Sequence, residues 1–205
     1  ILGIIQGLTE FLPISSSGHL VLVQEILGLE LPGNDFEILL HLGTLCSILV
    51  VFFKDIKNIF LTISSKKTQK FTLMIFIGTI PAVIIGLGLK DSIEQLFDDF
   101  LVVGFALIFT GLILISSLYF NRQKNEYSIS SSFLIGLAQA VAIIPGISRS
   151  GMTISCALLL GLDSKQAAKF SFLLAIPVIG GAGLLMLADM ENGLNIDIST
   201  SLAGF

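Results

Sequence analysis

The chain has 205 residues, a formal net charge of −4 and a mean hydropathy of +0.95, and only 13% of its residues are charged. A typical soluble domain carries about 25% charged residues, so the composition excludes a soluble globular enzyme and a disordered chain. Several stretches contain no Asp, Glu, Lys or Arg and approach or exceed the roughly 20 apolar residues that cross a bilayer; they are 71–89, 100–120, 127–148 and 170–188. We therefore expect an all-α, polytopic integral membrane protein. No basic block of the kind that follows a nucleic-acid backbone is present.

Charged clusters divide the apolar sequence into four predicted transmembrane spans, 38–53, 71–89, 101–120 and 170–188. Segments rich in Lys and Arg mark the cytoplasmic side of a membrane protein. By this rule the loops predicted to be cytoplasmic are 54–70, 121–126 and 162–169. The loops predicted to be external are 28–37, 90–99 and the segment after 189.

Two further apolar segments, 1–27 and 132–161, are interrupted in the middle and do not suit a simple span. The first contains Pro13 followed by a run of serines, and the second contains Pro145-Gly146 followed by a similar run. Each half has only about 10 to 13 residues, which is too short to cross a bilayer. Exposed backbone at such a break is tolerated only inside the protein or beside a wet cavity. Both segments are therefore predicted to be re-entrant helix–loop–helix hairpins.

The two interrupted segments also resemble each other at an offset of 133 residues. The identical pairs are Gly3 and Gly136, Gln6 and Gln139, Ile14 and Ile147, Ser15 and Ser148, Ser17 and Ser150, and Gly18 and Gly151. The first hairpin is predicted to enter from outside and the second from the cytoplasm, which is the pattern of an inverted-topology repeat. We expect a single integral membrane domain over 1–205, with one repeat over about 1–126 and a truncated second repeat over about 132–205. Completing the second repeat would take about two more C-terminal spans, so the sequence is predicted to be a fragment.

Ionisable residues inside apolar segments usually mark a functional site in a membrane protein. Leaving aside Glu25 near the end of its segment, they are Glu10, His19, His41 and Arg149. Arg149 keeps its charge and therefore needs an anion or a wet cavity. Glu10 is its natural partner if the hairpins meet tip to tip, and one interpretation is an ion pair that only clips the hairpins together.

The residues around the two breaks favour a phosphate site over a simple clip. Each break places serines at the start of a half-helix, where free backbone N–H groups and the helix dipole attract anions, and a guanidinium grips phosphate through two hydrogen bonds. The hydroxyl groups that would contact the phosphate are those of Ser15, Ser17, Ser148, Ser150 and Thr153.

Ser16 and His19 are three residues apart and would share a helix face. Ser16 can attack with His19 as the base, or His19 can itself be the nucleophile or the general acid. Glu10 can orient His19 or hold a divalent cation. A substrate contact and a structural role are equally open for Gln6, and His41 is interpreted as a packing or second-layer residue.

The motifs Gln6-Gly7-Leu8-Thr9-Glu10-Phe11-Leu12-Pro13-Ile14-Ser15-Ser16-Ser17-Gly18-His19-Leu20 and Pro145-Gly146-Ile147-Ser148-Arg149-Ser150-Gly151-Met152-Thr153 resemble those of the bacterial undecaprenyl-diphosphate phosphatases of the bacitracin-resistance type. The resemblance covers the whole chain. It departs at Gln6, where the family commonly has Glu, so a second carboxylate is absent there.

The resemblance implies hydrolysis of undecaprenyl diphosphate to undecaprenyl phosphate and inorganic phosphate, which recycles the lipid carrier for cell-wall synthesis and confers bacitracin resistance. It implies a catalytic set of Glu10, Ser16, His19 and Arg149, a divalent cation (Mg²⁺ or Ca²⁺), and a bacterial inner-membrane enzyme whose site opens to the external side. It leaves the nucleophile undecided, and a homodimer stays an open alternative. The other hypothesis is an inverted-repeat transporter or polyprenyl-phosphate flippase, which explains the symmetry but gives Ser16 and His19 no role.

Overall fold

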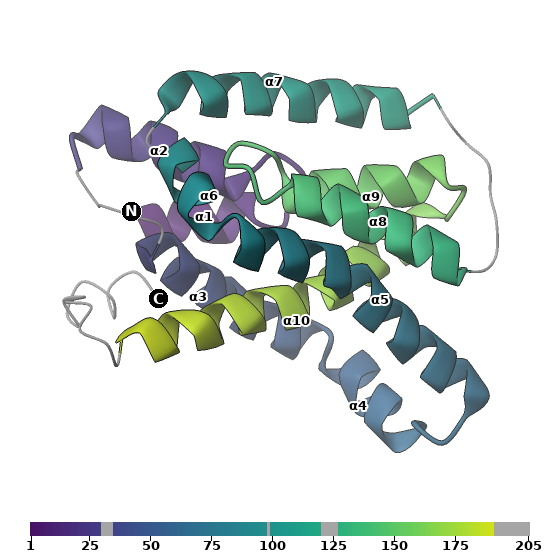
Figure 1. The fold of residues 1–205 in the computed structure, drawn as a ribbon. Helices are drawn as coiled ribbons and strands as arrows, with labels where there is room; N and C mark the ends of the chain where they lie inside the picture. The colour runs from purple at the N-terminus through teal and green to yellow at the C-terminus, as the bar shows by residue number, and fades with distance from the viewer. Residues whose placement is uncertain (30–34, 98, 120–126, 191–205) are drawn as a thin grey trace.

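The computed structural model describes residues 1–29, 35–97, 99–119 and 127–190, and these form ten helices and no strand. Figure 1 shows the helices stacked into one bundle. The helices are α1 (Leu2–Thr9), α2 (Ser16–Leu27), α3 (Asp35–Val51), α4 (Phe53–Leu61), α5 (Lys66–Gly88), α6 (Lys90–Phe97), α7 (Phe100–Ser117), α8 (Ile129–Val141), α9 (Arg149–Leu159) and α10 (Ser164–Met190).

Among the described residues, three helices are long and apolar enough to cross a membrane: α5, α7 and the part of α10 that runs to Met186. They cover most of the spans predicted over 71–89, 101–120 and 170–188, although residue 120 lies outside the described residues. The span predicted over 38–53 differs, because α3 ends at Val51 and the chain bends by 66° into α4. Only together are α3 and α4 long and apolar enough for a broken span or a re-entrant loop.

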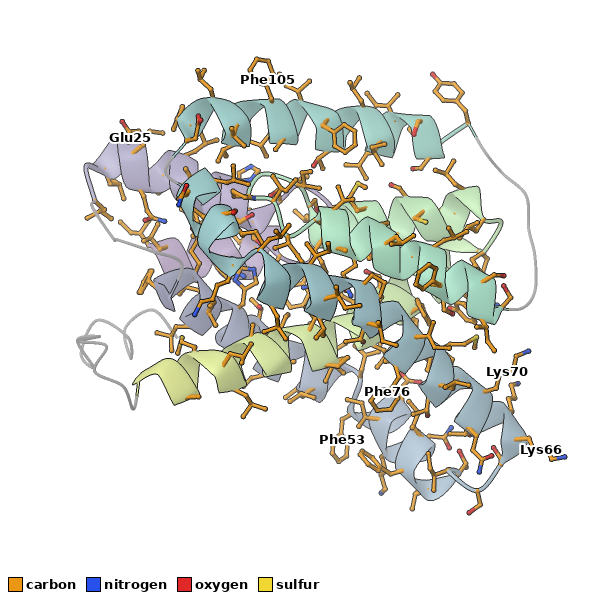
Figure 2. The ribbon with its side chains drawn as sticks, viewed as in Figure 1. Glu25, Phe53, Lys66, Lys70, Phe76 and Phe105 are labelled. Carbon is orange, nitrogen blue, oxygen red and sulfur yellow. The ribbon has the colours of Figure 1, made fainter. Side chains whose placement is uncertain are left out.

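The charge pattern predicted loops over 54–70 and 90–99. Most of these two segments is instead occupied by α4, the first turn of α5 and α6. Charge marks where the chain leaves the hydrocarbon region, but it does not mark where a helix ends. In α4, Phe53, Ile56 and Phe60 recur at the spacing of one helix face. Lys66 and Lys70 lie at the lower end of α5 in Figure 2 and point away from the bundle.

Helix α10 contacts α3, α5 and α9. Its Phe170 and Leu174 are fully buried and pack with Met74 of α5, Ile135 of α8 and Ala157 of α9. In contrast, α7 turns apolar side chains outward, and Phe105 points away from the bundle in Figure 2 with 70% of its surface exposed. Such a broad exposed apolar face suits contact with lipid, and the chain is a multi-pass membrane protein.

Helices α5 and α8 cross with their backbones in contact. A Cβ placed on Gly136 would lie 2.4 Å from the carbonyl oxygen of Gly78. Small residues at such crossings are how membrane helices approach closely. This crossing fixes α8, and therefore the break that follows it, against the rest of the bundle.

Candidate active site

The breaks after α1 and α8 share one feature, although the backbone of the capping serine differs between them. In each, a serine caps the following helix: Ser15 Oγ accepts a hydrogen bond from the Gly18 N–H at 3.3 Å, and Ser148 Oγ accepts one from the Gly151 N–H at 3.0 Å. Helices α2 and α9 begin at residues 16 and 149, which is the offset of 133 found in the sequence. Among the described residues, Ser15 is the single residue other than glycine with a positive φ, of 67°, which is a backbone geometry that concentrates at functional sites.

The two breaks touch each other. The Gly146 N–H donates to Ser17 Oγ at 3.4 Å, and Ser150 Oγ donates to the Leu12 carbonyl at 3.3 Å. Gly146 has a φ of 88°, and a Cβ there would lie 2.6 Å from the Val103 carbonyl oxygen of α7. Only glycine therefore lets the second break fit between α7 and the first break.

Thr110 of α7, which is not among the predicted site residues, holds the second break in place. Its hydroxyl donates to the Gly146 carbonyl and accepts from the Ser148 N–H, each at 3.1 Å, and the side chain is buried. A threonine in an apolar span gave no signal, because its partners are 36 and 38 residues away in the sequence.

The carboxylate of Glu10, which is buried just after α1, is the centre of the polar contacts. Its Oε1 pairs with Arg149 Nη2, so the structure brings together the residues predicted to be partners. Its Oε2 accepts from Ser16 Oγ at 2.5 Å and from Gln6 Nε2 at 3.1 Å. His41 Nε2 lies 3.2 Å from the same oxygen. Glu10 therefore joins α1, α2, α3 and α9.

These groups surround a small cavity of about 60 Å³, which has room for a few water molecules or a small polar group. Its lining residues are mostly polar and come from both breaks and from α3: Glu10, Ser15, Ser16, Ser17, His41, Ala142, Ile147, Ser148, Arg149 and Ser150. Four of the five hydroxyl residues predicted to contact phosphate line it.

The cavity suits an anion. Helices α2 and α9 begin at its wall, so the partial positive charge of two helix N-termini lies beside it. Arg149 adds a full positive charge, and its second terminal nitrogen, Nη1, is buried with no hydrogen-bond partner among the described residues. A buried guanidinium nitrogen without a partner is costly, and a phosphate oxygen in the cavity would satisfy it.

Three of the predicted site residues do not line the cavity. Gln6 lies behind Glu10 and contacts it from one turn earlier on α1. Thr153 is fully buried and bonds to Ser171 Oγ of α10 at 2.6 Å. The Nδ1 atom of His19 lies at hydrogen-bond distance, 2.7 Å, from the carbonyl oxygen of Ser15. Their predicted roles in substrate binding or catalysis stay predictions.

His41, which is predicted to be a packing or second-layer residue, belongs to the polar site. It lines the cavity and contacts Glu10 directly. Its place inside an apolar segment marks it as a candidate in the sequence, but its contact with Glu10 depends on how α3 packs against α1.

The residues of this site do not form a preformed cation site. No group of three or more His, Cys, Asp or Glu side chains suits a metal ion in the part of the chain that the structure describes. Both oxygens of Glu10 already have partners, one of them a guanidinium. Mg²⁺ is often held by one or two carboxylates together with substrate phosphates, so Glu10 would have to release a partner to bind it. The cation and the role of Glu10 as its ligand stay predictions.

Known proteins resemble this chain along its whole length. The family model of the bacitracin resistance protein BacA matches residues 1–205. The chain belongs to this family. An undecaprenyl-diphosphatase of Halothermothrix orenii is 47% identical over 94% of this chain and 75% of its own length. The undecaprenyl-diphosphatases of Carboxydothermus hydrogenoformans and Methanosphaera stadtmanae are 46% and 42% identical to this chain. The two matches cover 100% of this chain and 80% and 81% of those proteins.

Proposed function

We propose that this chain is a membrane-embedded undecaprenyl-diphosphatase in which Ser16, Glu10 and Arg149 carry out the reaction. It hydrolyses undecaprenyl diphosphate to undecaprenyl phosphate and inorganic phosphate. The product is the lipid carrier that cell-wall synthesis uses again, and the activity confers bacitracin resistance. The observation that carries the assignment of roles is the contact of Glu10 with both Ser16 and Arg149 at one cavity.

Ser16 is the proposed nucleophile. Its hydroxyl donates to Glu10 Oε2 at 2.5 Å, so the carboxylate is placed to take the proton as Oγ attacks the terminal phosphorus. The new bond joins Ser16 Oγ to this phosphorus, and the bond to the bridging oxygen breaks. Undecaprenyl phosphate leaves with the bridging oxygen, and water then hydrolyses the phosphoserine to give inorganic phosphate and free Ser16.

Arg149 is the proposed anchor for the terminal phosphate. Phosphoryl transfer is catalysed mainly by positioning and by stabilising charge on the phosphoryl oxygens. The free Nη1 of Arg149 and the two helix N-termini provide that charge. Ser148 and Ser150, whose hydroxyls lie 3.3 Å apart beside Arg149, are proposed to donate to phosphate oxygens.

Phosphate release from undecaprenyl diphosphate by the purified protein in detergent tests these roles, with and without Mg²⁺ or Ca²⁺. Ser16→Ala is expected to lower the rate by about 1,000-fold or more, as losses of catalytic nucleophiles do, while a non-hydrolysable analogue still binds. Arg149→Ala is expected to weaken binding and turnover together. Ser64→Ala, in the exposed turn between α4 and α5, is the control and should keep the rate. Phosphate release that survives Arg149→Ala would show that the pair of Glu10 and Arg149 only connects the two hairpins.

The two broken segments are proposed to be re-entrant hairpins of an inverted repeat, in an enzyme of the bacterial inner membrane whose site opens to the external side. The equal offset of the helix starts and the packing of α1 on α2 and of α8 on α9 support this proposal. Cysteines placed at Ser128 and Asp163, the two ends of the second hairpin, should react with an impermeant reagent from the cytoplasmic side alone. Reaction from opposite sides would show that this segment crosses the membrane.

A further inference from the structure

His41 is the one described cavity residue that comes from outside the two breaks and their flanking helices. It lies on α3, which packs against α1 and α10. Its ring is fixed at both ends: Nδ1 lies 2.7 Å from the Glu37 carbonyl oxygen, and Nε2 lies 3.2 Å from Glu10 Oε2. A histidine used only for packing would not need polar partners at both nitrogens.

The contacts of His41 define where its hydrogens are. A carbonyl oxygen only accepts hydrogen bonds, so Nδ1 carries a hydrogen and donates it to Glu37. The contact of Nε2 with a carboxylate oxygen is attractive only if Nε2 also carries a hydrogen. The charged groups that face this ring are Glu10 from the end of α1, Arg149 across the cavity from α9, and Glu37 from its own helix.

The donors to Glu10 differ in what they can position. Gln6 lies one turn before Glu10 on the same helix, so it moves with α1 and cannot fix the carboxylate relative to the other helices. Ser16 gives up its hydrogen in the proposed reaction, and Arg149 is the proposed anchor for the substrate. His41 is the remaining donor, and it reaches Glu10 from a separate helix.

We propose that His41 is a positioning residue for this reaction: it donates from Nε2 to Glu10 and thereby holds Oε2 against the Ser16 hydroxyl. The proposal rests on the proposed function and adds a role that neither sequence motif contains. When a phosphate draws Arg149 away from Oε1, His41 keeps the carboxylate aimed at Ser16. The role needs a donor at this position and does not need an imidazole.

The test compares His41→Gln with His41→Met. The two replacements have similar length, but only glutamine can donate a hydrogen bond to Glu10. His41→Gln is expected to keep kcat within about fivefold of the wild type. His41→Met is expected to lose between about 10-fold and 100-fold in kcat with little change in KM, which corresponds to one hydrogen bond to a charged group. Leu49→Met, on a part of α3 that is 39% exposed, is the control for a methionine on this helix.

Thermal unfolding in detergent shows whether both variants are folded. A folded His41→Met protein with wild-type kcat would overturn the proposal and make His41 a packing residue. Equal losses in both folded variants would also overturn it, because a hydrogen-bond donor would then not restore the rate. A wild-type protein that releases no phosphate would instead reject the proposed function, and the positioning role with it. If the wild-type protein is active, a negative result for the His41 variants rejects the positioning role alone and leaves the proposed function intact.

Discussion

The hydroxyl of Thr110 should contribute measurably to the stability of the bundle and to the geometry of the site. Thr110→Val keeps the shape of the side chain but removes its hydrogen bonds to Gly146 and Ser148. Interhelical hydrogen bonds in membrane proteins contribute about 0.6 kcal/mol on average and up to about 1.7. The two bonds together therefore predict a loss of about 1–3 kcal/mol in the free energy of unfolding.

Thr79→Val is the matched control for this loss. Thr79 is also buried, but its hydroxyl bonds to the Ile75 carbonyl of its own helix at 2.8 Å. Such a bond adds little to a helix whose carbonyls already have partners. Unfolding in detergent, followed by circular dichroism against denaturant, should therefore show a clear shift for Thr110→Val and almost none for Thr79→Val.

Thr110→Val should also affect catalysis, because Ser148 caps α9 and lines the cavity. We expect phosphate release to fall by about tenfold, which is about 1.4 kcal/mol in the barrier. Equal stability and equal activity for the two valine variants would refute the role of Thr110 in holding the second break.

Two other predictions concern parts of the molecule away from the cavity. Gly136→Ala would push a methyl group into the Gly78 carbonyl, whose oxygen lies 2.4 Å from the Cβ position. It should lower the free energy of unfolding in detergent by about 1–3 kcal/mol. Gly111→Ala is the control, because its Cβ meets no described atom within 4 Å, and it should show little change. Burial, together with the negative charge of Asp163, raises the pKa of Tyr127 above its usual value of 10, so its folded state retains the proton and stability is lost as the pH rises above 10. An ultraviolet titration should show a tyrosine that ionises well above pH 10 and is lost in Tyr127→Phe, and an unchanged curve for this variant would contradict the prediction.

The helix breaks and the pairing of Glu10 with Arg149 could be predicted from the sequence because their causes are local. Proline, glycine and serine interrupt a helix wherever they occur together, and a permanently charged side chain in an apolar segment requires a partner. The helical nature of α4 was also visible in the spacing of Phe53, Ile56 and Phe60, but the lysines around them were interpreted as a loop.

The positions of His41 and Thr110 could not be predicted in the same way. Each acts on a break that is distant in the chain, and each lies there because of how one helix crosses another. His41 reaches Glu10 because α3 packs on α1, and Thr110 reaches Gly146 because α7 packs on α9. Residue periodicity identifies the faces of a helix but not its partners, so such contacts require the tertiary structure.

The feature that the two breaks share has a consequence for how such a site can originate. Ser16 and Arg149 are the first residues of α2 and α9, and each follows a serine whose hydroxyl accepts from the N–H three residues later. A symmetric dimer of one hairpin would offer two serines or two arginines at these places, and either pair would lack half of the chemistry. Joining both copies in one chain allows a single position to differ between them, so that one copy attacks and the other holds the anion.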